Sequence, residues 1–65
     1  MIKVIQSKHR RAIYTDTTVH IYTNKARKGN NIPVWRSAYP ESECANPKEA
    51  ARVWVEDAVI MFDVR

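Results

Sequence analysis

The sequence predicts an α+β domain: a three- or four-stranded antiparallel sheet followed by one C-terminal helix packed on one face of the sheet. Two observations support this fold class. Residues 1–40 contain short segments rich in β-branched and aromatic residues, and residues 46–62 carry apolar residues at helical spacing. With 65 residues, of which 45% are hydrophobic and 28% charged, the chain has the size and composition of one small domain spanning residues 1–65.

The predicted helix spans Asn46–Phe62. Asn46 is a preferred N-cap residue, and Pro47 suits the first helical position. Glu49 can reach back to the cap or favour the positive end of the helix dipole. The face expected to be buried carries Ala50, Ala51, Trp54, Val55, Ala58, Met61 and Phe62.

The end of this helix is open to two interpretations, because residues 59–64 are rich in β-branched side chains. In the first, the helix continues to Phe62. In the second, it ends near Asp57 and residues 59–64 form a final strand that pairs with residues 1–6. The continued helix is the favoured interpretation.

Two turn-forming stretches separate the β segments. Asp16-Thr17-Thr18 predicts a tight hairpin turn. Residues 24–31, with the only glycine and three asparagines, predict a longer hairpin turn with a basic tip. Pro33 indicates an edge position for the strand that follows, or a start one residue later. The expected strands are Met1–Gln6, Ala12–Thr15, Val19–Thr23 and Ile32–Tyr39.

Strand alternation predicts which side chains face the helix. We expect Ile13, Val19 and Ile21 to face it. The side chains expected on the opposite face are Arg10, Ala12, Tyr14, His20 and Tyr22.

The last expected strand leaves two possibilities for Trp35. Either Trp35 and Tyr39 are core and Arg36 points outward, or Val34 is core and Trp35 is exposed. The first is favoured, because a tryptophan in so small a domain is more often buried.

Residue types that carry catalysis or hold cofactors are sparse and scattered. His9 and His20 lie on different predicted elements and Cys44 lies in a loop, so no pair has the spacing of a metal site. The stretch 25–31 has one glycine and lacks the Gly-Lys-Ser/Thr of a phosphate loop. We therefore expect a protein that is not an enzyme and holds no metal or cofactor.

Cysteine content and hydropathy bear on location. A single cysteine excludes an intramolecular disulfide, which favours a reducing compartment. The N-terminal residues do not have the pattern of a signal peptide, and no apolar run approaches the ~20 residues of a membrane span. A cytoplasmic protein with no membrane partner is expected.

The net charge of +4 is unevenly distributed along the chain. Residues 1–40 hold eight Lys/Arg and one Asp, a net charge of +7, and residues 41–65 hold three Lys/Arg and six Asp/Glu, a net charge of −3. This asymmetry indicates a polyanion or an acidic surface as the partner of the first part. The alternative is that the two halves neutralise each other in the fold.

DNA or RNA is one candidate partner, since cationic side chains contact phosphates and exposed aromatic rings stack on bases. The residues predicted to bind nucleic acid or an acidic partner are Arg10, Arg11, Tyr14, Tyr22, Lys25, Arg27, Lys28 and Arg36.

A protein is the other candidate partner and the favoured one. Val53, Ile60 and Val64 form a second apolar stripe on the expected helix. This stripe needs a cover, which can be the segment Met1–Gln6, a second copy of the chain in a homodimer, or another protein. An exposed strand edge offers another docking route. We therefore expect a small, basic, non-enzymatic accessory protein of a phage or mobile element, an inhibitor that binds and blocks or modulates a host protein. Nucleic-acid binding through a basic, aromatic-bearing sheet face is the alternative.

The order of three strands and a helix, with Glu49-Ala50-Ala51-Arg52 opening the helix, resembles the sheet-reading DNA-binding domains of plant transcription factors and of phage-integrase arms. The glycines and the second tryptophan of that pattern are missing from the strands here. The resemblance therefore implies the fold class and no site residues.

Overall fold

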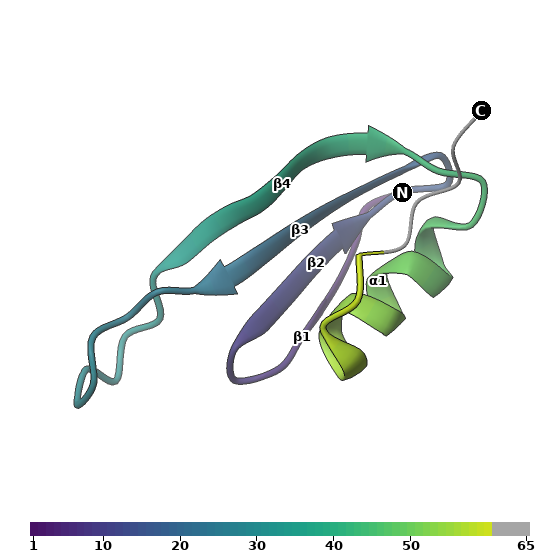
Figure 1. The fold of residues 1–65 in the computed structure, drawn as a ribbon. Helices are drawn as coiled ribbons and strands as arrows, with labels where there is room; N and C mark the ends of the chain where they lie inside the picture. The colour runs from purple at the N-terminus through teal and green to yellow at the C-terminus, as the bar shows by residue number, and fades with distance from the viewer. Residues whose placement is uncertain (61–65) are drawn as a thin grey trace.

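The computed structural model describes residues 1–60, which form a four-stranded antiparallel sheet followed by one helix (Figure 1). The elements are β1 (Lys3–Gln6), β2 (Arg10–Tyr14), β3 (Thr18–Asn24), β4 (Trp35–Glu43) and α1 (Pro47–Asp57). The strands follow one another in the sheet in the order β1-β2-β3-β4, so β1 and β4 are the edges. The predicted α+β class, with one C-terminal helix on one face of an antiparallel sheet, is confirmed.

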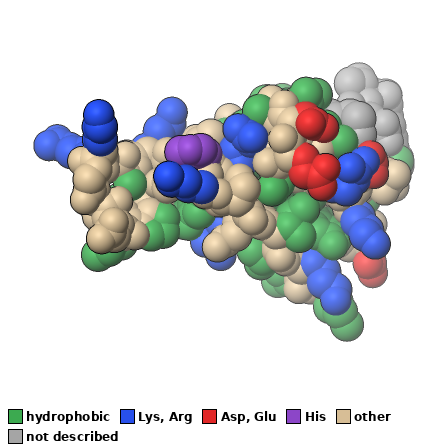
Figure 2. Space-filling view, turned by 90° about the horizontal axis from the view of Figure 1, so that it is seen from below, with side chains coloured by type: hydrophobic (Ala, Val, Ile, Leu, Met, Phe, Trp, Pro, Cys, Tyr) green, Lys and Arg blue, Asp and Glu red, His purple; other side chains and the backbone are tan. Residues whose placement is uncertain are grey.

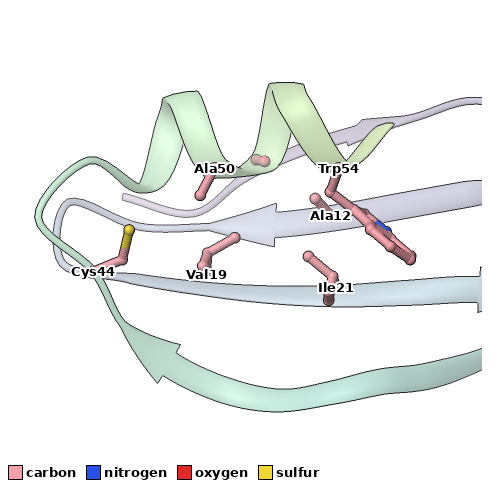
Figure 3. Close-up of a cluster of buried hydrophobic side chains, with 7 residues drawn as sticks. Ala12, Val19, Ile21, Cys44, Ala50 and Trp54 are labelled. Atoms are coloured by element: carbon pink, nitrogen blue, oxygen red, sulfur yellow. The ribbon is translucent and has the colours of Figure 1, made fainter. Parts of the chain in front are cut away.

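The core lies between α1 and the sheet (Figure 3). Its buried side chains are Ala12, Val19 and Ile21 from the sheet, Cys44 from the segment before the helix, and Ala50, Ala51 and Trp54 from the helix. The three alanines allow α1 to approach the sheet closely, and Trp54 is the largest side chain of the cluster. The Nε1–H of Trp54 donates a hydrogen bond of 3.1 Å to the Tyr22 carbonyl, which ties the helix to β3.

The helix ends at Asp57, so the predicted continuation to Phe62 is wrong. Ala58 is left-handed with a φ of 57°, and its N–H donates to the Trp54 carbonyl over 3.0 Å, which closes the helix. The β-branched Val59 and Ile60 that follow have low helix propensity. Residues 59 and 60 belong to no helix or strand, and the rest of the alternative final strand lies outside the described residues.

The start of α1 agrees with the prediction in position but differs in its capping. Pro47 is the first helical residue, and the Asn46 carbonyl accepts the Ala50 N–H at 3.0 Å. The Asn46 side chain makes no capping hydrogen bond. Glu49 does not reach back to the cap but pairs with Arg52 on the next turn.

The register of the β2–β3 hairpin reverses the predicted orientation of β2. Ala12 pairs with Ile21, and Ile13 pairs with His20, so Ala12 lies beneath the helix and Ile13 lies on the opposite face. The prediction that Ile13 faces α1, with Arg10, Ala12 and Tyr14 on the other side, is therefore wrong. A shift of one residue in register moves every side chain of a strand to the other face.

The turn between β2 and β3 fixes this register. The Thr15 N–H donates to the Thr18 carbonyl over 2.9 Å, and the Thr15 hydroxyl accepts the N–H groups of Thr17 and Thr18 at 3.3 and 3.0 Å. Tyr14 is thereby placed opposite Val19. The predicted tight hairpin is present, and the hydrogen bonds of its turn hold the two strands in this register.

The last strand begins and ends later than predicted, at Trp35–Glu43 instead of Ile32–Tyr39. It includes Pro40, which an edge strand tolerates because its outer backbone groups have no ladder to complete. The pairing of β4 with β3 shifts register on both sides of Ile21, which places extra residues on β4.

Candidate nucleic-acid interface

The sheet face opposite α1 is covered by no other element of residues 1–60, and we call it the open face. The strand register places on it Val4 and Gln6 of β1, Arg11 and Ile13 of β2, His20 and Tyr22 of β3, and Trp35 and Ser37 of β4. One row of paired residues crosses all four strands, from Gln6 through Arg11 and Tyr22 to Ser37. Trp35 lies beside the β4 end of this row.

Arg11 and Trp35 form a cation–π pair on the open face. The Cζ atom of Arg11 lies 5.8 Å from the centroid of the Trp35 ring, and both side chains are half-buried. The Nε of Arg11 is buried and has no hydrogen-bond partner among the described residues. The guanidinium is therefore held by packing and by the ring, and its charge is not neutralised by a carboxylate of residues 1–60.

The favoured core position for Trp35 is wrong. The core cluster lies under α1 and is filled by Trp54, whereas Trp35 sits at the start of an edge strand on the other face. Val34, the other candidate for the core, is 39% exposed and precedes the strand.

A chain of hydrogen bonds fixes the Tyr22 ring on the open face. The Ser37 hydroxyl donates to the Tyr39 carbonyl at 3.0 Å, so it accepts from the Nε2–H of His20 at 2.8 Å. The Nδ1 of His20 is then the acceptor for the Tyr22 hydroxyl at 2.9 Å. The two rings also pack together, with centroids 4.4 Å apart. Tyr22 is thus preorganised beside Arg11, its partner in the register.

Cations gather where the β1–β2 turn meets the β3–β4 loop, and we call residues 7–11 and 24–36 the basic end. Residues 7–11 hold three Lys/Arg and residues 24–36 hold four, seven in all, with no Asp or Glu in either segment. Lys25, Arg27 and Lys28 are exposed. Figure 2, seen from the side of the helix, shows Lys and Arg side chains around this end, on the left, and Asp and Glu side chains toward the opposite end.

Asn24 joins the two segments of the basic end. Its N–H donates to the His9 carbonyl at 2.9 Å, and its Nδ2 donates to the Lys8 carbonyl at 3.1 Å. Its Oδ1 accepts the N–H groups of Ala26 and Val34 at 2.9 and 3.1 Å. This one side chain closes the base of the β3–β4 loop and attaches the loop to the neighbouring turn.

The ion pairs within residues 1–60 are confined to α1, where Arg52 pairs with Glu49 and Glu56. The hydrogen bond and charge of Glu49, with the charge of Glu56, raise the pKa of Arg52 above its ordinary value. No cation of the basic end has such a partner in the described part of the chain. Its positive charge is therefore available to a polyanion.

The residues predicted to bind nucleic acid or an acidic partner divide into three groups. Arg11 and Tyr22 lie on the open face, Lys25, Arg27 and Lys28 lie in the loop of the basic end, and Arg10, Tyr14 and Arg36 lie on the face that carries α1.

The third group cannot act with the open face. The Nε of Arg10 donates to the Val55 carbonyl at 3.3 Å, and Tyr14 packs against the core. Arg36 is exposed and lies opposite Thr23, on the helix side of the sheet. The structure thus brings five of the eight predicted residues, Arg11, Tyr22, Lys25, Arg27 and Lys28, to the open face and the exposed loop of the basic end.

The residues predicted to form a protein interface do not make a helical stripe among the described residues. Val53 is half-buried on α1, whereas Ile60 lies beyond the helix end and is 48% exposed. Val64 lies outside the described residues.

Sequence reasoning missed the roles of Asn24 and Ser37. Both are common surface residue types, and their partners lie on other strands or turns. No local signal marks either residue, because Asn24 bonds to Lys8 sixteen positions away and Ser37 to His20 seventeen positions away.

No protein-family model, curated protein or solved structure matches this chain. Residues 1–60 contain no group of three or more His, Cys, Asp or Glu side chains arranged to hold a metal ion. No helix of these residues has the length and apolar character needed to cross a membrane.

Proposed function

We propose that this protein binds nucleic acid through the open face and the basic end. One observation carries the proposal. The uncovered face of the sheet holds Trp35, Tyr22 and Arg11 together, next to four further cations, Lys8, Lys25, Arg27 and Lys28, in segments that contain no Asp or Glu. Cations that contact phosphates and aromatic rings that stack on bases are the two components of sheet surfaces that bind nucleic acid.

The two parts of the surface have different tasks in this proposal. Lys25, Arg27 and Lys28 are exposed on a loop that projects beyond the rest of the sheet, where they contact phosphates (Figure 1). Trp35 and Tyr22, held by Arg11 and by the His20 chain, offer fixed rings to bases. The helix, which carries the ion pairs of residues 1–60, stays on the far side of the sheet.

Fluorescence anisotropy of labelled DNA and RNA, single-stranded and duplex, tests the proposal. Binding is expected at about 50 mM salt and is expected to weaken steeply toward about 200 mM, because counterions are released from the phosphates. The triple variant Lys25→Gln, Arg27→Gln, Lys28→Gln should weaken binding and flatten the dependence of log affinity on log salt by about 0.7 for each lost contact to a single strand.

Lys48→Gln is the matched control, because Lys48 is an exposed cation that lies on α1 and not in the basic end. It should bind as the wild type does. Absence of binding to every probe at about 50 mM salt would exclude the proposal.

A second candidate function, binding to a protein, is favoured by one observation. The consecutive aliphatic side chains Val59 and Ile60 are each 48% exposed just beyond α1. A second copy of the chain is the simplest partner. Light scattering that gives twice the 7.6 kDa mass supports self-association, and loss of that dimer in Ile60→Asn would assign the contact. A monomer that recovers no partner in a pull-down would remove this candidate.

A further inference from the structure

A hollow of about 330 Å³ opens beside Trp35, at the border between the open face and the basic end. Trp35 is one of its lining residues, and four of the other seven, Gln6, Asn24, Asn30 and Asn31, carry amide side chains. An aromatic wall combined with amides is suited to a nucleobase, which has a flat π-face and an edge of donors and acceptors.

A second hollow, of about 280 Å³, adjoins the first and shares Lys8, Asn24 and Asn30 with it. Its other lining residues include Arg27 and Lys28. A cationic hollow next to an aromatic one matches the two ends of a nucleotide, the phosphate and the base. Together the two hollows have a volume within the range of small-ligand sites, and the first alone lies at the lower end of that range.

The walls of both hollows are preformed. The hydrogen bonds of Asn24 hold the loop against the β1–β2 turn. Within the loop, the Asn30 N–H donates to the Arg27 carbonyl at 3.0 Å, and the Asn30 Oδ1 accepts the Ile32 N–H at 2.9 Å. Gly29 takes a φ of 88°, which the turn requires. The loop is therefore ordered before a ligand binds, and binding does not have to offset the conformational entropy of ordering it.

Two amides of the first hollow remain available to a ligand. Gln6 and Asn31 make no side-chain hydrogen bond to the rest of residues 1–60, whereas Asn24 and Asn30 use their side chains to build the loop. An amide offers one acceptor and two donors, and it can pair with the edge of a base.

We propose that the two hollows bind one unpaired nucleotide of a single-stranded nucleic acid, with its base against Trp35 and beside Asn31 and its phosphate beside Lys8, Arg27 and Lys28. This inference rests on the proposed function and narrows its substrate to single strands. In a duplex, neighbouring base pairs cover both faces of each base and the bases are not free to enter the hollow. Only an unstacked base can lie flat on the indole.

The test compares a single-stranded oligonucleotide of about 12 residues, oligodeoxythymidine or oligodeoxyadenosine, with a duplex of the same length. The single strand should bind at least tenfold more tightly. Trp35→Ala should reduce affinity for the single strand by between about 5-fold and about 100-fold, the range for loss of one base–aromatic stack, and leave duplex affinity unchanged. Asn31→Ala should reduce the affinity for the single strand by a smaller factor. Trp35→Phe should retain most of that affinity, because a phenyl ring can still stack on a base.

Intrinsic fluorescence gives a readout that does not depend on a destabilised variant. Trp35 should be quenched by the single strand, and the quenching should disappear in Trp35→Phe, because the remaining Trp54 is only 7% exposed. Circular dichroism establishes that each variant is folded; should Trp35→Ala unfold, Asn31→Ala and the quenching decide the question.

The outcomes separate this inference from the proposed function. If single strands bind with salt dependence but Trp35→Ala and Asn31→Ala bind as the wild type does, the nucleotide site is wrong and the proposed function stands. The nucleotide site would also be overturned if the wild type bound the duplex more tightly than the single strand. The same holds if Trp35→Ala lost equal affinity for the single strand and the duplex. Absence of all binding overturns both.

Discussion

The two faces of the sheet are built from different chemistry. The face under α1 is closed by small apolar side chains, Ala12, Ala50 and Ala51, and by one large ring, Trp54. The open face has its own tryptophan, but Trp35 is covered by a cation instead of a helix. The comparison indicates that burial beneath the helix stabilises the domain, whereas the open face keeps its rings and charges available for binding.

The largest expected effect is on the covered face. Trp54→Ala removes the largest core side chain and its hydrogen bond to the Tyr22 carbonyl, and should lower the free energy of unfolding by about 3–5 kcal/mol. That is comparable to the whole stability of many domains of this size, so the variant should be largely unfolded. Urea unfolding followed by circular dichroism measures it.

Trp35→Ala is the matched control for this prediction, since it removes the same side chain from the open face. Its cost should be about 1 kcal/mol, mainly the lost cation–π contact. Equal destabilisation by the two substitutions would contradict the difference between the faces.

An intermediate effect is expected at the basic end. Asn24→Ala removes three side-chain hydrogen bonds and leaves the N–H groups of Ala26 and Val34 without their partner, so it should cost about 1–3 kcal/mol. Hydrogen exchange of these two amides should accelerate. Asn31→Ala, in the same loop, is the control and should change neither the free energy of unfolding nor the exchange rates of the two amides. If the amides of Ala26 and Val34 stay protected in Asn24→Ala, the loop is held by other contacts.

The smallest effect is expected within the open face. Ser37→Ala removes the acceptor for His20 Nε2–H and should cost about 0.5–1.5 kcal/mol. The ¹⁵N shifts of the His20 ring should report a change in the populated tautomer. Ser42→Ala, which loses a similar hydroxyl bond to the Pro40 carbonyl on the same strand, should leave the His20 ring unchanged.

The fold class was predictable from local signals, whereas the facing of β2 was not. Turn residues and β-branched segments indicate hairpins, and Pro47 marks the start of the helix. Strand alternation with Ile13 in the core predicts the opposite facing, with Ala12 away from the helix. The close approach of the alanine-bearing helix instead requires the smaller residue, and this requirement arises from packing between distant segments.

The candidate site was predictable in composition and not in geometry. Lys25, Arg27 and Lys28 are apparent as a charged loop tip in the sequence. The hollows beside Trp35 are formed by the β1–β2 turn and the β3–β4 loop, which are joined through Asn24. No local pattern encodes that junction, because each hydrogen bond of Asn24 to the turn spans a whole hairpin.

The irregular pairing of β4 has a consequence for how any macromolecule approaches this protein. Pro40 supplies no N–H, and the register shifts on both sides of Ile21 make the pairing of β4 with β3 irregular, so this rim offers no regular series of donors and acceptors. The opposite rim, β1, is only four residues long. Growth of the sheet by addition of a foreign strand is disfavoured at both rims, which protects the protein against fibrillar stacking.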